Sequence, residues 1–215
     1  MQTKLIEKEI KYTGNELAPH WIYKNFKIQG DAIVAFCGEC EVDLSEMVDI
    51  EDVINNEPIY SKLMLNFIVE NFNIGLVEGV LRQRLLITII KEVLEEEAKR
   101  QRGKEAKKNE DHASMHPDIF ASKTPFTIHH SPLTRNGDDL FVNNKKLSVS
   151  IATKSLTSVL IHTGINIDPS GAPVDAIGLN SLNIENVKEF AQKVMMKYSE
   201  EIDDIILAST KVSGR

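Results

Sequence analysis

Several residue types that define specialised protein classes are scarce in this sequence. Two cysteines, Cys37 and Cys40, in a chain of 215 residues exclude a disulfide framework. Eleven glycines and seven prolines are too few for a collagen-like or low-complexity chain. Long apolar runs are also missing, because the longest, residues 85–90, is interrupted by Thr88 and is too short to span a bilayer. The first ten residues contain no apolar segment typical of a signal peptide. We therefore expect a soluble, cytoplasmic protein with no membrane partner.

Basic residues are outnumbered by acidic ones, 25 against 32, which gives a net charge of −7. Nucleic-acid binding needs a basic surface that neutralises phosphates, so this balance argues against a nucleic-acid partner. One local exception is residues 99–108, where six basic residues accompany one acidic residue. The run favours a solvated helix end over an RNA-binding surface. We expect a single domain over residues 1–215, with a mobile polar excursion at about 101–115.

Hydrophobic periodicity predicts strands and helices in alternation. Strands are expected at residues 21–28, 32–42, 62–72, 125–130, 139–147, 148–155 and 158–167, with a helix as the alternative for residues 62–72. Helices are expected at residues 43–56, 80–100 and 186–207, the first capped by Asp49 or Ser45. Turns are expected at residues 29–31, joining the first two strands as a hairpin, and between Gly75 and Gly79. The predicted fold class is α+β, with a mixed, mostly antiparallel sheet flanked by helices.

Motifs of several common enzyme classes are absent. The sequence contains no G-x-x-x-x-G-K-[ST] phosphate loop, no G-x-G-x-x-G and no G-x-S-x-G elbow. Cys37 and Cys40 have the C-x-x-C spacing of a redox or metal motif, but a zinc site needs about four ligands and no second pair exists. Their place inside a predicted strand favours core cysteines over redox chemistry. His112 and His116 have a helical metal-ligand spacing but lie in the polar excursion, so no metal site is expected.

The most informative stretch is residues 134–182, where charged side chains gather around a predicted hairpin. These side chains are Arg135, Asp138, Asp139, Lys145 and Lys146. Asn143 and Asn144 suit a tight hairpin turn, because asparagine accepts a positive φ. Strand alternation places Asp139 and Phe141 on one face of the strand. On residues alone, ionic groups at a strand entrance fit either a functional site or rim charges.

This stretch resembles the catalytic domain of biotin and lipoate protein ligases. Those enzymes carry a basic residue, Asn-Asp, an apolar strand, a short turn, a lysine and small residues, and then a strand that ends in Gly-x-Asn before a proline-containing loop and Ser-Leu. The matching positions are Arg135, Asp138, Asp139, residues 140–142, Asn143, Asn144, Lys145, Lys146, Leu147, Ser148, Gly164, Asn166, Pro173, Ser181 and Leu182. Residues 62–72 look like the Asn-containing strand of lipoate ligases. The whole chain also looks like an uncharacterised archaeal and thermophilic-bacterial family with a domain of unknown function.

The resemblance implies a pocket that holds an acyl or acyl-adenylate group against the sheet. Arg135 would contact a carboxyl or phosphate group, Asp139 would orient or deprotonate an amine, and Lys146 would act on the activated carboxyl; these three are the implied catalytic residues. The implied substrate-binding residues are Asp138, Ser148, Ser150, His162 and Asn166, the last closing the pocket floor.

The sequence departs from those ligases at the nucleotide site. Their Arg- and Gly-rich loop has no match, and the nearest basic cluster is Arg82 and Arg84. ATP use therefore stays open, and Arg82 and Arg84 could replace the loop only if they face the pocket. The leading hypothesis is acyl activation or transfer on a small carboxylic acid or acyl ligand, with a protein acceptor as one option. The alternative is a non-catalytic small-molecule binding module on the same scaffold. The sequence does not define the oligomeric state.

Overall fold

The structure is a computed structural model that describes residues 1–112 and 133–214. Its strands are β1 (Gln2–Leu5), β2 (Ala32–Val42), β3 (Ile59–Phe72), β4 (Leu133–Asn136), β5 (Asp139–Val142), β6 (Lys145–Lys146), β7 (Ser148–Lys154) and β8 (Ser158–Asp168). Its helices are α1 (Trp21–Phe26), α2 (Ile50–Asn55), α3 (Leu76–His112) and α4 (Val187–Thr210), with short 3₁₀ helices η1 (Leu44–Glu46) and η3 (Leu179–Leu182).

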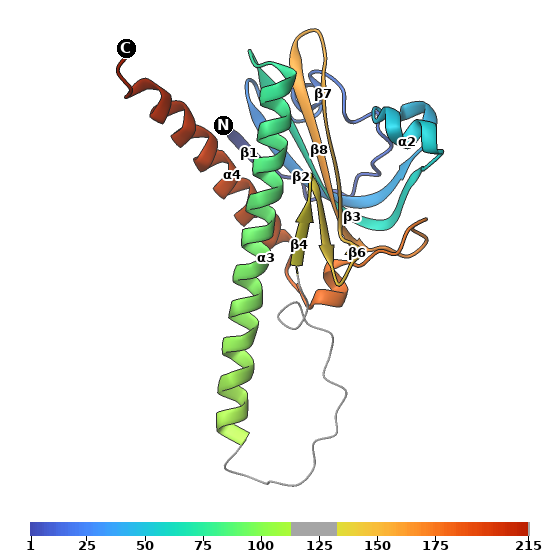
Figure 1. Cartoon of the computed structure of the whole chain (residues 1–215), viewed down its shortest axis with the longest axis vertical. Coiled ribbons are helices and arrows are strands. Elements are labelled where there is room, and N and C mark those ends of the chain that lie inside the picture. The colour runs from blue at the N-terminus through green and yellow to red at the C-terminus, as the bar shows by residue number, and fades with distance from the viewer. Residues whose placement is uncertain (113–132, 215) are drawn as a thin grey trace.

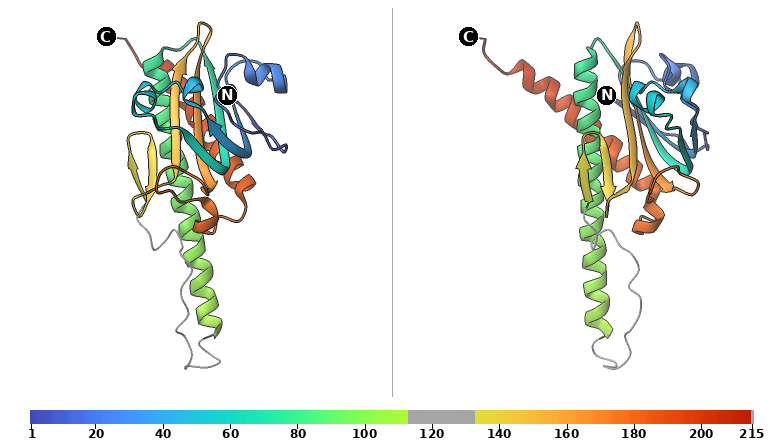
Figure 2. Two further views of the ribbon diagram at one scale, coloured as in Figure 1. Left: turned by 90° about the vertical axis from the view of Figure 1, so that its right-hand side faces the viewer. Right: turned by 45° about the vertical axis from the view of Figure 1, so that its right-hand side comes forward.

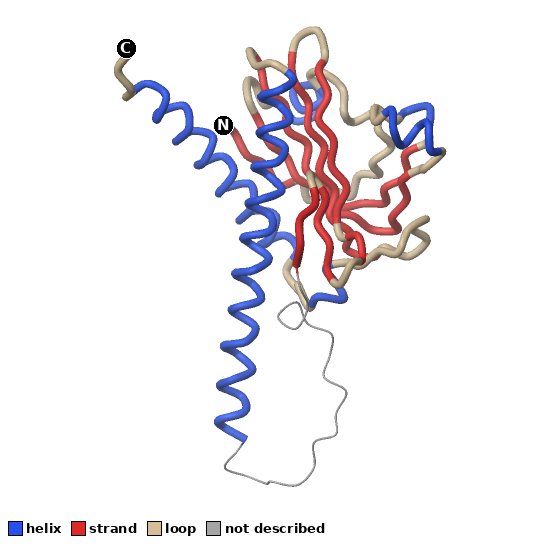
Figure 3. The backbone as a smooth tube through the Cα atoms, viewed as in Figure 1, coloured by secondary structure: helices blue, strands red, loops and turns tan. Residues whose placement is uncertain are grey.

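Five strands form a central sheet in the order β1-β2-β3-β8-β7 (Figures 1 and 3). β1 runs parallel to β2, whereas the other neighbours in this sheet are antiparallel. β4, β5 and β6 form a second antiparallel sheet. The expected α+β fold with a mixed, mostly antiparallel sheet flanked by helices is confirmed.

The two faces of the central sheet are covered by different parts of the chain. Figure 2 shows α3 and α4 on one face and α1 and α2 on the other. Side chains alternate along β8, so Ile161 and Ile165 join the large core beneath α3 and α4. His162 and Asn166 point to the opposite face, where a smaller core surrounds them. Two polar side chains of the central strand β8 thus face the side that the short helices cover.

Residues 21–28 do not form the expected strand. Residues Trp21–Phe26 are helix α1, bounded by His20 and Lys27, both with φ of 61°. The helix buries Ile22 against the smaller core. Over so few residues the hydrophobic patterns of a helix and of a strand cannot be distinguished, so this tertiary contact determines which one forms. The hairpin across residues 29–31 is therefore wrong, and β2 has the parallel strand β1 as its neighbour instead.

Helix α3 is longer than expected at both ends. It begins at Leu76, so Gly79 lies inside the helix and does not bracket a turn. A Cβ at Gly79 would lie 2.3 Å from Val159 Cγ1, so the missing side chain allows α3 to approach β8 closely. The helix continues to His112, so residues 101–112 are helical rather than a loop. Residues 113–116 and the strand expected at 125–130 lie outside the described residues.

Other local predictions are confirmed. The Asp49 side chain caps α2 by accepting hydrogen bonds from the backbone N–H groups of Glu51 and Asp52. Asn143 and Asn144, with φ of 51° and 64°, form the turn of the β5–β6 hairpin. α4 covers the helix expected at residues 186–207. Within residues 1–112 and 133–214, no helix has both the length and the apolar character that crossing a bilayer requires.

Candidate functional site

A cavity of about 470 Å³ opens on the sheet face that carries His162 and Asn166. Its floor includes Met64 of β3 beside these two residues, and Tyr12 from the N-terminal segment closes one side. The segment from η1 through α2 forms one wall, and Asp139 and Lys146 of the β5–β6 hairpin form another. The volume lies in the range of about 300–1,000 Å³ that small-molecule sites occupy.

Asp139 and Lys146 form an ion pair at the wall of the cavity, with Lys146 Nζ 2.9 Å from Asp139 Oδ2. The backbone fixes Lys146, because its N–H donates to the Asp175 carbonyl and its own carbonyl accepts from Ile177 N–H. Burial raises the pKa of Asp139 above its ordinary value, although the Lys146 ammonium acts in the opposite direction. The pair therefore combines a cation, partly open to solvent, with a carboxylate of raised basicity.

His162 forms a neutral, oriented part of the cavity floor. It is 3% exposed, and burial lowers its pKa to about 3. Its ring stacks on Tyr12, with centroids 3.7 Å apart and planes inclined by 14°. Asn66 Nδ2 donates to the Met64 carbonyl, so Asn66 Oδ1 must accept from His162 Nε2 at 3.0 Å. This contact assigns the proton to Nε2 and leaves Nδ1 as a hydrogen-bond acceptor.

Six of the eight implied site residues line the cavity, namely Asp138, Asp139, Lys146, Ser150, His162 and Asn166. Arg135 and Ser148 do not. The exposed Arg135 guanidinium donates to the Gly137 carbonyl at 2.7 Å, within its own turn. Ser148 is fully buried, and its hydroxyl accepts from Leu140 N–H at 2.8 Å. Ser148 therefore joins β7 to β5.

Gln83 of α3 connects two of these residues from the helical side of the sheet. Its Nε2 donates to Asp138 Oδ2 at 2.7 Å and to Ser150 Oγ at 3.1 Å. The Ser150 hydroxyl in turn donates to the His162 carbonyl at 3.0 Å. These contacts fix Asp138 and Ser150 relative to β8, so their hydrogen-bonding capacity is largely used within the protein.

Sequence reasoning missed the N-terminal and α2 sides of the cavity. Tyr12, Asp49, Glu51 and Asp52 line it from segments with no recognisable motif. Asn66, which contacts the cavity residue His162, could have been noticed in the sequence, because it is a polar residue within a mainly apolar part of strand β3. A buried asparagine needs a partner, and here the partner is His162.

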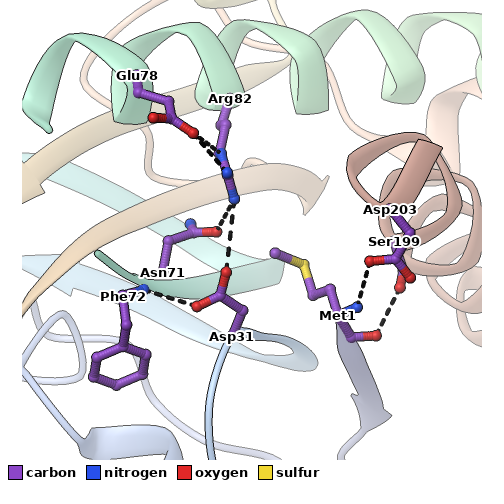
Figure 4. Close-up of polar contacts among 8 residues, drawn as sticks. All are labelled: Met1, Asp31, Asn71, Phe72, Glu78, Arg82, Ser199 and Asp203. Carbon is purple, nitrogen blue, oxygen red and sulfur yellow. Dashed lines mark hydrogen bonds and ion pairs between the residues drawn. The ribbon is translucent and has the colours of Figure 1, made fainter. Parts of the chain in front are cut away.

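Arg82, part of the nearest basic cluster to a phosphate loop, belongs to a separate network around the buried Asn71 (Figure 4). Its guanidinium donates to Asn71 Oδ1 at 2.8 Å and to Glu78 Oε1 at 2.6 Å, and lies 3.7 Å from Asp31 Oδ2. Asp31 also accepts from Phe72 N–H, so the network joins α3 to the ends of β2 and β3. Arg84 is exposed. Neither arginine lines the cavity.

Cys37 and Cys40 are free thiols of β2 that do not line the cavity. Burial raises the pKa of Cys40 to about 12 and also raises that of Cys37. Thiols of high pKa are poor nucleophiles and poor metal ligands, which agrees with their interpretation as core residues. Among the side chains that the structure describes, no three or more His, Cys, Asp or Glu residues converge as metal ligands.

Solved structures with the same fold include ligases. The chain is similar to a protein of unknown function from Pyrococcus horikoshi, at 33% identity and a TM-score of 0.80, over 100% of this chain and 98% of that one. Biotin protein ligase from Aquifex aeolicus matches at 18% identity and a TM-score of 0.52, over 95% of this chain and 71% of the ligase. Ta0514 of T. acidophilum, a candidate lipoate protein ligase with bound lipoic acid, matches at 14% identity and a TM-score of 0.50, over 94% and 86%. The biotin/lipoate ligase-like fold is confirmed.

Comparison of sequences gives the family. The uncharacterized protein MJ0805 of Methanocaldococcus jannaschii is 36% identical over 211 residues, covering 95% of this chain and 81% of the relative. The sequence profile of a domain of unknown function, DUF366, matches residues 1–112 and 120–213. The chain therefore belongs to the DUF366 family.

Proposed function

We propose that this chain is a cytoplasmic protein that binds a small carboxylic acid or its acyl derivative in the cavity and catalyses acyl activation or transfer. The observation that carries the proposal is the Asp139–Lys146 ion pair at the wall of a cavity of ligand size, on a fold shared with biotin protein ligase. The two free cysteines suit the reducing conditions of a cytoplasm.

The two charged groups have complementary roles in this proposal. Lys146 places an ammonium group where it can stabilise negative charge on an acyl oxygen as a nucleophile attacks. Asp139, whose pKa is raised by burial, accepts the proton of an attacking amine. A bond forms between the amine nitrogen and the acyl carbon, the bond from that carbon to the leaving group breaks, and the amine proton passes to Asp139. The amine belongs to a small molecule or to a protein acceptor.

His162 and Asn166 contribute orientation. Both are buried and both lie on β8, a central strand, so their positions are set by the sheet. The neutral His162 ring supplies an acceptor atom without adding charge. Apolar side chains such as Met64, Val149 and Ile151 also line the cavity and suit the hydrocarbon part of an acyl group.

A second candidate function, non-catalytic binding, is favoured by the position of the arginines. Arg82 is committed to Asn71, Glu78 and Asp31, and Arg84 is exposed away from the cavity lining. Neither provides the phosphate cradle that adenylation of an acid needs. The binder alternative predicts ligand recognition with no turnover.

Thermal-shift measurements with a panel of carboxylic acids of increasing chain length test the proposal, followed by exchange of labelled pyrophosphate into ATP with each acid that binds. We expect at least one acid to raise the melting temperature, and Lys146→Ala to abolish the shift. Lys145→Ala is the matched control, because Lys145 pairs with Asp175 and does not line the cavity. Pyrophosphate exchange identifies an adenylating enzyme, and binding without exchange favours pre-activated acyl substrates or the binder. An equal shift in the Lys146→Ala variant would contradict the proposal.

A further inference from the structure

The lining of the cavity is strongly acidic. Seven of its residues carry carboxylates, namely Glu46, Asp49, Glu51, Asp52, Glu57, Asp138 and Asp139. Among the described residues that line it, Lys146 is the basic one. A ligand that offered only a carboxylate would meet one favourable charge and a wall of unfavourable ones.

The orientation of α2 strengthens this charge asymmetry. Glu51 and Asp52 line the cavity, whereas Ile50 and Ile54 do not and are 74% and 77% exposed. If an apolar tail lay under α2, the hydrophobic effect would favour the aliphatic face turned inward. Glu51 and Asp52 line the cavity instead, which favours a polar group in the part of the ligand beneath α2.

Two acceptor atoms on the cavity floor, carried by largely buried residues, provide an independent observation. His162 and Asn166 are 3% and 5% exposed, and both line the cavity. Nε2 of His162 is used by Asn66, and Nδ2 of Asn166 donates to the Lys146 carbonyl. Within residues 1–112 and 133–214, no hydrogen bond is made to His162 Nδ1 or Asn166 Oδ1. Both atoms are acceptors, so a ligand that completes them must donate.

The charge beneath α2 is better matched by an organic cation than by a metal ion. The acidic side chains are spread along the wall, and no three or more ligating side chains converge in the part of the chain that the structure describes. Burial and the neighbouring Asp49 charge raise the pKa of Asp52, although the Lys146 ammonium, whose ion pair is with Asp139, acts in the opposite direction. An ammonium group supplies both the positive charge and the N–H donors.

We infer that the ligand is an amino acid or aminoacyl compound, with its carboxyl or acyl group at Lys146 and its ammonium group among the carboxylates of α2. This inference rests on the proposed function, because the position of the carboxyl group follows from it. It specifies a zwitterion where that proposal allows any carboxylic acid.

Matched six-carbon probes test the inference by calorimetric titration. Hexanoate carries the carboxylate alone, hexylamine the amine alone, and 2-aminohexanoate and 6-aminohexanoate carry both at two spacings. We expect one of the two amino acids to bind at least about tenfold more tightly than hexanoate, since a charged hydrogen bond is added. Its N-acetyl derivative, which has lost the charge, should return to the affinity of hexanoate.

Variants of α2 locate the effect. Glu51→Gln and Asp52→Asn, singly and together, should remove the preference for the amino acid and leave hexanoate affinity unchanged or higher. Asp175→Asn is the control, because Asp175 is exposed and its carboxylate pairs with Lys145 outside the cavity. The single Glu51→Gln change keeps the test valid if the double variant unfolds.

The possible results separate the two proposals. Hexanoate binding that depends on Lys146 and equals amino-acid binding overturns the inference and leaves the proposed function standing. Binding of hexylamine without any of the acids overturns the role of Lys146 in carboxylate recognition. If none of the six-carbon probes binds, both proposals fail for ligands of this size. A preference for the amino acid that survives in the α2 variants contradicts the position assigned to the ammonium group.

Discussion

Lys146 reaches Asp139 diagonally across the β5–β6 hairpin. In the strand register Lys146 lies opposite Phe141, and Asp139 precedes Phe141 by two residues on the same face of β5. Lys146 and Asp139 form a 2.9 Å ion pair across this diagonal. The register depends on the two-residue turn of Asn143 and Asn144, both at positive φ, so a local turn signal determines which charges meet in the cavity.

Replacing Asp139 by Asn should leave stability unchanged or raise it at pH 7. Burial raises the pKa of Asp139 in the native state, whereas the unfolded chain has a pKa of about 3.9. At higher pH values the carboxylate is therefore ionised at a greater cost in the native state, and this cost lowers the free energy of unfolding. The Asp139 variant removes this cost, and the gain should disappear as the pH falls below about 4. Melting temperatures at the two pH values check the sign, and acyl ligand response should be lost in the same variant. A lower melting temperature at pH 7 would show that the ion pair is a net structural contact.

His162→Gln should flatten the acid limb of the stability profile. The native pKa of His162 is about 3, whereas the unfolded value is about 6.5, so the unfolded state gains a proton over this interval. Stability from this group is complete above pH 6.5 and falls toward pH 3, by up to about 1.4 kcal/mol per pH unit. Denaturant unfolding at several pH values measures the slope. His20→Asn, which removes an imidazole outside the cavity lining, should keep the wild-type slope; equal slopes in wild type and His162→Gln would contradict the burial of a neutral ring.

The cysteine variants should lose stability and keep ligand response. Cys40 is completely buried, so Cys40→Ser introduces a hydroxyl in a place with no established partner, at a cost of about 1–3 kcal/mol. Cys37 is half-buried, and Cys37→Ser should cost less. Chemical denaturation and thermal shift with a bound acid measure the two effects. Loss of ligand response at full stability would place the site in the N-terminal half near β2.

Arg82→Met should destabilise the fold without changing ligand affinity in the folded fraction. The change leaves the buried Asn71 Oδ1 without its donor, at a cost of about 1–3 kcal/mol, and removes the cation that lies beside the partly exposed Asp31. Arg84→Ala, on the exposed side of the same helix, should have little effect on either quantity. A drop in affinity with Arg82→Met at unchanged stability would indicate that this arginine reaches the ligand.

The sequence could predict those parts of the fold that are determined by residues close together in the chain. Ala32–Val42 is rich in Ile, Val and Phe, Asp49 is a capping residue before a helical run, and the Asn143–Asn144 pair has few conformations available to it in a tight hairpin. Each of these was predicted from a few neighbouring residues. α1 was not, because only its burial of Ile22 against the sheet distinguishes a short helix from a short strand.

The cavity likewise combines residues that are close in sequence with residues that only the fold brings together. The hairpin and β8 supplied Asp138, Asp139, Lys146, Ser150, His162 and Asn166 from one continuous stretch of sequence. Tyr12 and the α2 carboxylates come from segments that reach the cavity only through the fold, and no spacing rule joins them to the hairpin. Arg135 and Ser148 belong to the same stretch of sequence but do not line the cavity, because their side chains bond within the hairpin region.

The central claim is that Lys146 holds the carboxyl group of the ligand. A double-mutant cycle tests it most directly, with the tightest-binding acid and its uncharged amide titrated into wild type and Lys146→Met. We predict that wild type prefers the acid over the amide by about tenfold or more, as expected for a charged hydrogen bond of roughly 1.5–3 kcal/mol, and that this preference vanishes in Lys146→Met. The same preference in both proteins would show that the carboxyl group lies elsewhere and would contradict the account.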